Sequence, residues 1–138
     1  MKRYLLDTGP LGAYLQGRQP AVDLIVPWIR RGEATTSILV YGEIIEYLKS
    51  LRDYPARHLG LRALLGAISP SLLTYAIMER YAQIRRTLRP PHGPGLIGDI
   101  DTLIAATALE GNLTVVTTDS DYERVPGLRV RRISLKRV

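Results

Sequence analysis

The sequence predicts an α/β fold in which helices cover both faces of a central, mostly parallel sheet of about five strands. Short apolar or β-branched runs alternate with segments of helical periodicity along the chain, a pattern typical of parallel strands joined by right-handed helical crossovers. At 138 residues the chain is long enough to bury one core and short for two. We therefore expect a single domain over residues 1–138 and one functional site.

The first predicted strand covers residues 3–7, a short apolar run that ends in an acid. The Thr-Gly-Pro segment that begins at Thr8 is suited to opening a helix. A second helix is predicted over 21–31, because its apolar residues form a stripe that is broken only by Pro27 and ended by Gly32.

The middle of the chain repeats the alternation of strand and helix. β-branched residues predict a strand over 33–38, and apolar residues at helical spacing predict a helix over 39–51. Further helices are predicted over 55–67 and 74–89, with a short strand or turn at 68–74 between them.

The last third begins with a loop over 89–98, where three Pro and three Gly in ten residues exclude regular structure. A helix is predicted over 100–110, stopped by the Gly-Asn pair that follows it. Residues 113–118 read as a buried strand and 128–135 as an edge strand.

The composition narrows the class of protein. With 46% apolar and 23% charged residues the chain is typical of soluble globular proteins, and no segment has the apolar length needed to span a bilayer. Only three apolar residues stand between the basic N-terminus and Asp7, too few for a signal peptide. We expect a cytoplasmic protein without a membrane partner.

Arginine dominates the basic residues, since only three of the 19 are lysine. Arginine suits bidentate recognition of phosphate, so nucleic acid is a plausible partner, with Arg85, Arg86 and Arg89 as candidate contacts. The alternative is a composition bias or a hot habitat, with most of these side chains solvated or in surface ion pairs. The eight tyrosines could stack on bases, although most fall at helical core spacing.

Acidic residues gather at the predicted strand ends. Asp7 ends the first strand and Asp119 follows the strand over 113–118, so the two carboxylates meet if those strands are neighbours. Asp101 starts a helix and Glu43 lies early in another, which allows both to face the same edge.

Taken singly, these acids have ordinary structural explanations. Asp99 is placed as a helix N-cap, Asp101 suits the positive end of a helix dipole, and Asp119 or Asp121 can shape a turn. Taken together they repel, because like charges about 4 Å apart cost roughly 4 kcal/mol per pair at an effective dielectric constant near 20. Protons or cations relieve that repulsion.

The available ligands favour a hard divalent cation. The chain has no Cys, which excludes thiolate ligands and a cysteine nucleophile, and neither His58 nor His92 is assigned a role. Oxygen ligands suit Mg²⁺ or Mn²⁺, which can activate water and neutralise charge in phosphodiester hydrolysis. The arginines would then hold the polyanion.

Three segments resemble the PIN domain, and specifically the VapC-type toxin nucleases of prokaryotic toxin-antitoxin pairs: LLDTGPL, SILVYGEII and DIDTLIAATALEGNLTVVTTDSDY. The resemblance spans the whole chain and is most specific in the last segment. It implies that four acids are the catalytic and metal-binding residues and that two threonines support them. The acids are Asp7, Glu43, Asp101 and Asp119, and the threonines are Thr8 and Thr117.

The family pattern favours Asp101 over Asp99, because the third acid stands three residues before the Ile-Ala-Ala run. Asp99 and Asp121 are then caps or supporting groups. Glu46 is solvated or salt-bridged. Tyr122 stands where many relatives have Phe, a mild departure that leaves the catalytic assignment unchanged.

Membership would imply a three-layer α/β/α fold, Mg²⁺ or Mn²⁺ dependence, endoribonuclease activity, homodimerisation, and neutralisation by a VapB-like antitoxin that covers or enters the acidic groove. Two other hypotheses remain. One is a PIN-like module that binds RNA or a partner without cutting. The other is a receiver-like phosphotransfer domain, which needs a central aspartate and a late lysine, whereas this chain has Glu43 and three lysines at Lys2, Lys49 and Lys136.

Overall fold

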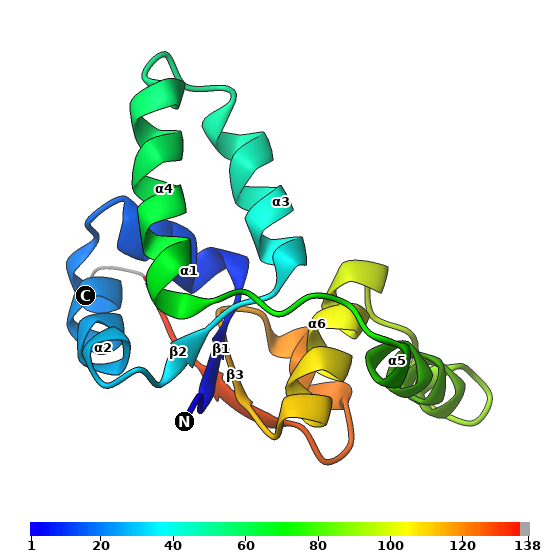
Figure 1. Ribbon diagram of the computed structural model, residues 1–138. Coiled ribbons are helices and arrows are strands. Elements are labelled where there is room, and N and C mark those ends of the chain that lie inside the picture. Colours follow the sequence, from blue (N-terminus) through cyan, green and yellow to red (C-terminus); the bar gives the residue numbers. More distant parts are fainter. Residues whose placement is uncertain (136–138) are drawn as a thin grey trace.

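The computed structural model describes residues 1–135, so the last three residues of the predicted domain over 1–138 lie outside the described part. Its four strands form one parallel sheet in the order β2-β1-β3-β4 (Figure 1). The strands are β1 (Tyr4–Leu6), β2 (Ala34–Thr35), β3 (Thr114–Thr117) and β4 (Arg129–Arg132). The predicted α/β class and parallel sheet are confirmed, with one strand fewer than the five expected.

Six α-helices and one short 3₁₀ helix, η1, occur among the described residues. The helical segments predicted from periodicity are all present, and their ends differ from the prediction by one to three residues. The helices are α1 (Thr8–Leu15), α2 (Gln19–Arg30), α3 (Ile38–Leu48), α4 (Tyr54–Ile68), α5 (Tyr75–Leu88), α6 (Asp99–Gly111) and η1 (Ser120–Arg124).

The helices lie on both sides of the sheet. Helices α5 and α6 pack together on one side, and α1 and α2 pack together on the other (Figure 1). Helices α3 and α4 form a third pair, which rises beyond one edge of the sheet in the same view. In this arrangement, the carboxyl ends of β1 and β3 lie between the helices that cover the two faces of the sheet.

The predicted fifth strand over 68–74 is reduced to a single bridge between Ser37 and Ser71. Pro70 has no N–H to donate to a ladder, and Ser71 alone makes backbone–backbone hydrogen bonds to the neighbouring segment among residues 69–71. The predicted strand over 33–38 is also shorter, because Ser37 leaves it to cap α3 and accepts a hydrogen bond from the N–H of Leu39 at 3.1 Å.

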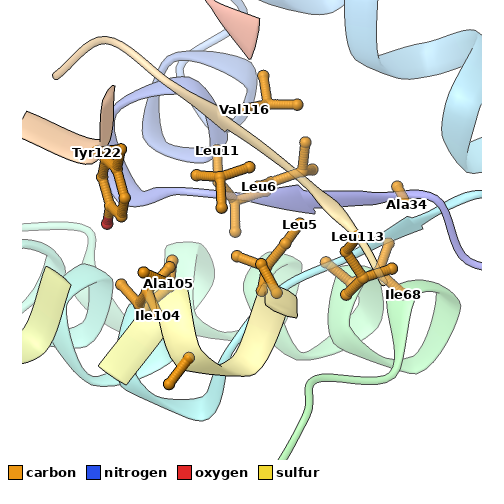
Figure 2. Packing of buried hydrophobic residues seen from close by; sticks show 14 of the residues in the cluster. Leu5, Leu6, Leu11, Ala34, Ile68, Ile104, Ala105, Leu113, Val116 and Tyr122 are labelled. Atoms are coloured by element: carbon orange, nitrogen blue, oxygen red, sulfur yellow. The ribbon is translucent and has the colours of Figure 1, made fainter. Parts of the chain in front are cut away.

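The core lies between the sheet and the helices (Figure 2). Leu5 and Leu6 point to opposite faces of β1 and are both fully buried, as expected for a parallel sheet with two covered faces. Ala105, Ala106 and Ala108 are also fully buried, and their small side chains let α6 lie close to its neighbours. No helix among residues 1–135 is long and apolar enough to cross a membrane.

Candidate metal centre

Asp7 and Asp119 lie at the same edge of the sheet because β1 and β3 are adjacent and parallel. Leu6 pairs with Val116, and the N–H of Asp7 continues the ladder by donating to the carbonyl of Val116 at 2.9 Å. The strand adjacency on which their predicted convergence depended is therefore confirmed.

Thr117 joins these two acids directly. Its buried hydroxyl donates to Oδ2 of Asp7 at 2.7 Å and accepts from the backbone N–H of Asp119 at 3.0 Å. One hydroxyl thus fixes the Asp7 side chain relative to the backbone of Asp119, in line with the supporting position that the resemblance implied.

Asp119 in turn sets the position of Asp121. Oδ1 of Asp119 accepts from the backbone N–H of Asp121 at 2.8 Å and caps η1. Carboxylate oxygens of Asp101, Asp119 and Asp121 all lie within 4.8 Å of one another. Asp121, expected to be a cap or a supporting group, therefore belongs to the closest group of acids in the described part of the chain.

Asp101 projects from the first turn of α6, and Gly98 rather than Asp99 occupies the N-cap position. The carbonyl of Gly98 accepts from both the backbone N–H and the hydroxyl of Thr102. Oδ1 of Asp101 accepts from the hydroxyl of Tyr122 at 3.1 Å. Sequence reasoning missed this contact, because Tyr122 had been read only as a replacement for Phe.

Asp99 points away from the acid group, toward α5. It accepts from Arg85 Nη1 at 2.6 Å and from the Tyr81 hydroxyl at 3.3 Å, and its side chain is 71% exposed. Arg85 is thus occupied in an ion pair, whereas Arg86 and Arg89 are exposed. The structure therefore gives Asp99 and Asp101 different neighbours.

Glu43 lies beside the group on α3. Its Oε1 accepts from the hydroxyl of Thr8 at 2.7 Å, which links the first residue of α1 to this acid. The negative charge of Glu43 is felt by Asp7 and raises its pKa. Glu43 is therefore a neighbour of Asp7 but lies outside the closest group of three.

The pKa values reflect this crowding. Burial raises the pKa of Asp7, hydrogen bonds from Thr117 and from the backbone of Thr8 oppose the rise, and Glu43 adds to it. Burial also raises the pKa of Asp101; the Tyr122 hydrogen bond opposes this rise, and the charges of Asp7, Asp119 and Asp121 add to it.

Tyr122 itself remains a proton donor among these acids. Its side chain is fully buried, and burial together with the charges of Asp7 and Asp101 raises the pKa of its phenol far above the ordinary value. The hydroxyl therefore keeps its proton at any physiological pH and can donate it in a hydrogen bond to a carboxylate.

The donor set fits a hard divalent cation. The acid group offers only carboxylate oxygens, and the chain has no Cys that would favour a softer metal. A positive charge there would relieve both the repulsion and the burial cost of ionised Asp7 and Asp101. Asp101, Asp119 and Asp121 are the closest candidate ligands, with Asp7 next to them.

A groove of about 1070 Å³ lies between α1, α2, α3 and α4. Most of its lining is apolar and includes Val22, Val26, Leu48 and Leu64. Thr8 also lines the groove, and since Thr8 donates to Glu43, the groove reaches the margin of the acid site.

Solved structures of similar fold include chains of VapBC complexes and of a toxin-antitoxin complex from Klebsiella pneumoniae. The chain is similar to a chain of a DNA-bound VapBC complex from Salmonella typhimurium, with 19% identity and a TM-score of 0.83 over 96% of this chain and 98% of that one. It is also similar to a chain of VapBC2 from Rickettsia felis bound to a promoter DNA fragment, with 19% identity and a TM-score of 0.82 over 95% and 98% of the two chains.

A third similar chain belongs to FitAcB from Neisseria gonorrhoeae, with 22% identity and a TM-score of 0.76 over 92% of this chain and 95% of that one. None of the curated proteins matches the chain. The family model described as PIN domain matches residues 4–128, a span that includes the whole acid site. With the strand ends, the acid group and this match together, the chain belongs to the PIN-domain family.

Proposed function

We propose that this chain is a Mg²⁺- or Mn²⁺-dependent endoribonuclease and acts in the cytoplasm as the VapC-type toxin of a toxin-antitoxin pair. The observation that carries the proposal is the group of Asp101, Asp119 and Asp121 oxygens within 4.8 Å of one another, beside buried Asp7, in a PIN domain. Crowded carboxylates at a sheet edge are typical of a site that binds a cation, and the raised pKa values of Asp7 and Asp101 add to this indication.

In this proposal Asp7, Asp101 and Asp119 hold the metal, with Asp121 as a further ligand that the geometry adds. The bound ion supplies a Lewis acid that activates water and neutralises charge on the phosphate during hydrolysis. Glu43 orients the attacking water or binds a second ion. Its Oε1 is held by Thr8, which leaves Oε2 to accept a hydrogen bond from that water.

Exposed arginines beside the acid site are proposed to hold the RNA backbone. Arg86 and Arg89 lie at the C-terminal end of α5. This end of α5 is held beside the start of α6 by the ion pair between Arg85 and Asp99. Arg85 contacts RNA only if it leaves this ion pair, so Arg86 and Arg89 are the better candidates. Guanidinium groups at this position would bring backbone phosphates toward the carboxylates.

Cleavage of total RNA tests the nuclease proposal. Wild type, Asp101→Asn and the matched control Asp99→Asn are prepared identically and assayed with Mn²⁺, with Mg²⁺ and with EDTA. We expect metal-dependent cutting by wild type and Asp99→Asn, and none by Asp101→Asn. Cutting by Asp101→Asn at the wild-type rate would refute the assignment, and RNA binding by wild type without cutting would favour a non-catalytic module.

The partner proposed for the apolar groove is a VapB-like antitoxin. The similar solved chains come from toxin-antitoxin complexes, and the groove offers an apolar surface that ends near Glu43. An apolar antitoxin segment would fill the groove, and an arginine on it would be attracted to the acids.

Co-expression with a VapB-like protein tests the proposed antitoxin. We expect wild type to co-purify with it and to lose RNA cleavage. Val26→Glu in the groove should release the partner while the free variant still cuts RNA. Retained partner binding by Val26→Glu would refute this use of the groove.

Homodimerisation is the remaining part of the proposal. The segment before and at the start of α5 exposes several large apolar side chains: Leu72 is 66% exposed and Tyr75 94% exposed, with Leu73 and Met78 nearby in sequence. Apolar side chains grouped in this way are typical of an interaction surface. Light scattering should report a dimer for wild type and a monomer for Tyr75→Glu, and an unchanged mass for this variant would place the dimer surface elsewhere.

A further inference from the structure

One buried hydroxyl lies among the carboxylates without a role in the reaction proposed above. Tyr122 lies in η1, which starts directly after Asp119, and its ring is part of the hydrophobic core. Figure 2 shows its hydroxyl oxygen on the side of α6, the helix that carries Ile104 and Ala105. That hydroxyl donates to Oδ1 of Asp101 at 3.1 Å, and it also interacts with Asp7, where it opposes the rise in the pKa of that carboxyl.

The other acids of the site have a comparable restraint. In Asp7, Glu43 and Asp119, one carboxylate oxygen accepts a hydrogen bond from a protein donor, whereas Asp121 is paired with Arg124 at 3.5 Å. The pairs are Asp7 with the Thr117 hydroxyl, Glu43 with the Thr8 hydroxyl and Asp119 with the N–H of Asp121. For Asp101, the Tyr122 hydroxyl is the only such donor within residues 1–135.

We propose that Tyr122 is a positioning residue of the metal centre, whose hydroxyl holds Oδ1 of Asp101 so that Oδ2 faces a cation shared with Asp119 and Asp121. The inference rests on the proposed metal centre. Oδ2 of Asp101 accepts no hydrogen bond from residues 1–135, so it is available as a ligand. Mg²⁺ and Mn²⁺ favour near-octahedral oxygen sites, in which a carboxylate held in one orientation binds better than one free to rotate.

The rigid position of the ring makes this role possible. Tyr122 is fully buried, and the 3₁₀ helix that carries it is capped by Asp119, itself a member of the acid group. Asp119, another proposed ligand, therefore fixes the segment that carries Tyr122. The hydrogen bond from Tyr122 to Asp101 in turn links this segment, which follows β3, to α6.

Tyr122→Phe removes the hydroxyl and keeps the buried ring. Tyr81→Phe is a matched control. The Tyr81 hydroxyl donates to Asp99 at 3.3 Å, and Asp99 also lies in the first turn of α6 but is not a member of the acid group. Mn²⁺ affinity of each full-length protein is measured by electron paramagnetic resonance of the free ion. We expect about tenfold weaker Mn²⁺ binding for Tyr122→Phe, since loss of a hydrogen bond to a metal ligand costs about 10- to 100-fold, and no change for Tyr81→Phe.

A second readout guards against a loss of stability in the variant. For each protein, the melting temperature with Mn²⁺ is measured relative to that of the same protein without metal. This rise should be smaller for Tyr122→Phe than for wild type or Tyr81→Phe. Equal Mn²⁺ affinity and an equal rise in Tyr122→Phe and wild type would overturn the role of Tyr122 and leave the metal centre standing. Absence of Mn²⁺ binding in wild type would overturn both.

Discussion

The hydroxyl of Thr117 lies 2.7 Å from Oδ2 of Asp7, and these two residues are 110 positions apart in the chain. The same hydroxyl accepts the N–H of Asp119 at 3.0 Å. A single buried side chain therefore links the carboxylate of Asp7 to the backbone of Asp119. The parallel pairing of β1 with β3 makes this link possible, because it brings residues 7 and 117 to the same edge.

Thr117→Val tests the importance of this link. The substitution keeps the shape of the side chain but leaves the Asp119 N–H and a buried Asp7 oxygen without their partner. We expect the free energy of unfolding in urea to fall by about 1–3 kcal/mol, the cost of an unsatisfied buried polar group, and Mn²⁺ binding to weaken.

The matched control is Thr107→Val. Thr107 is equally buried, but its hydroxyl donates to the Leu103 carbonyl within α6 and contacts none of the acids. Its loss should cost less than about 1 kcal/mol and leave Mn²⁺ binding unchanged. Equal effects of the two substitutions would mean that Thr117 matters only for packing.

Asp101→Asn should stabilise the metal-free protein. The change removes one charge from a group in which Asp7, Asp119 and Asp121 all raise the Asp101 pKa, and Asn keeps an oxygen for the Tyr122 hydroxyl. In EDTA we expect the melting temperature to rise by about 4 °C, the shift that roughly 1 kcal/mol produces in a domain of this size.

Asp99→Asn is the control for charge removal at the start of α6. It breaks an exposed ion pair with Arg85, and such pairs contribute at most about 1 kcal/mol, so its melting temperature should stay level or fall slightly. A fall of the same size in Asp101→Asn would argue against repulsion within the acid group.

The pH dependence of the metal-free protein should carry the signature of Asp7. The pKa of Asp7 in the folded state is raised above its ordinary value of 3.8. At pH values between 3.8 and the folded-state pKa, the folded protein therefore binds more protons than the unfolded chain. Stability from this group is therefore full at low pH and is lost as pH rises through the folded pKa. In EDTA, the melting temperature of Asp7→Asn should gain on wild type as pH rises from about 4 to 7.

Saturating Mn²⁺ should reverse this trend in wild type, because the metal binds the deprotonated carboxylates. Asp7→Asn should respond less to Mn²⁺ at every pH. A constant difference between the two proteins across this range in EDTA would contradict the raised pKa of Asp7.

Arg86→Ala together with Arg89→Ala should weaken RNA binding. If each arginine contacts one phosphate, the slope of log affinity against log salt should fall by about 0.7 per residue for single-stranded RNA. Arg30→Ala is the control, since Arg30 ends α2 just before β2 begins and so lies at the opposite edge of the sheet from the acids. The same loss in both proteins would indicate only a general effect of charge.

Hydrophobic periodicity and strand chemistry were enough to predict the α/β class, and they placed Asp7 and Asp119 at one edge only on the condition that their strands are neighbours, which the structure supplies. These two signals do not choose between Asp99 and Asp101. Residues two positions apart on a helix project to opposite sides, and tertiary packing decides which side faces the sheet. The structure turns Asp99 toward Arg85 and Asp101 toward Tyr122. The role of Asp121 depends on the 3₁₀ geometry after Asp119, which turn residues alone do not specify.

The two open edges of the sheet are unlike each other. One edge is the two-residue strand β2, which offers little backbone to another chain. The other is β4, whose Arg129, Arg131 and Arg132 are exposed and positively charged. Because a second sheet would have to bring like charges together to pair with β4, this edge resists the strand addition that leads to aggregation. The arginines of β4 thus oppose edge-to-edge pairing of two sheets and leave the surface of the proposed dimer at the start of α5 unaffected.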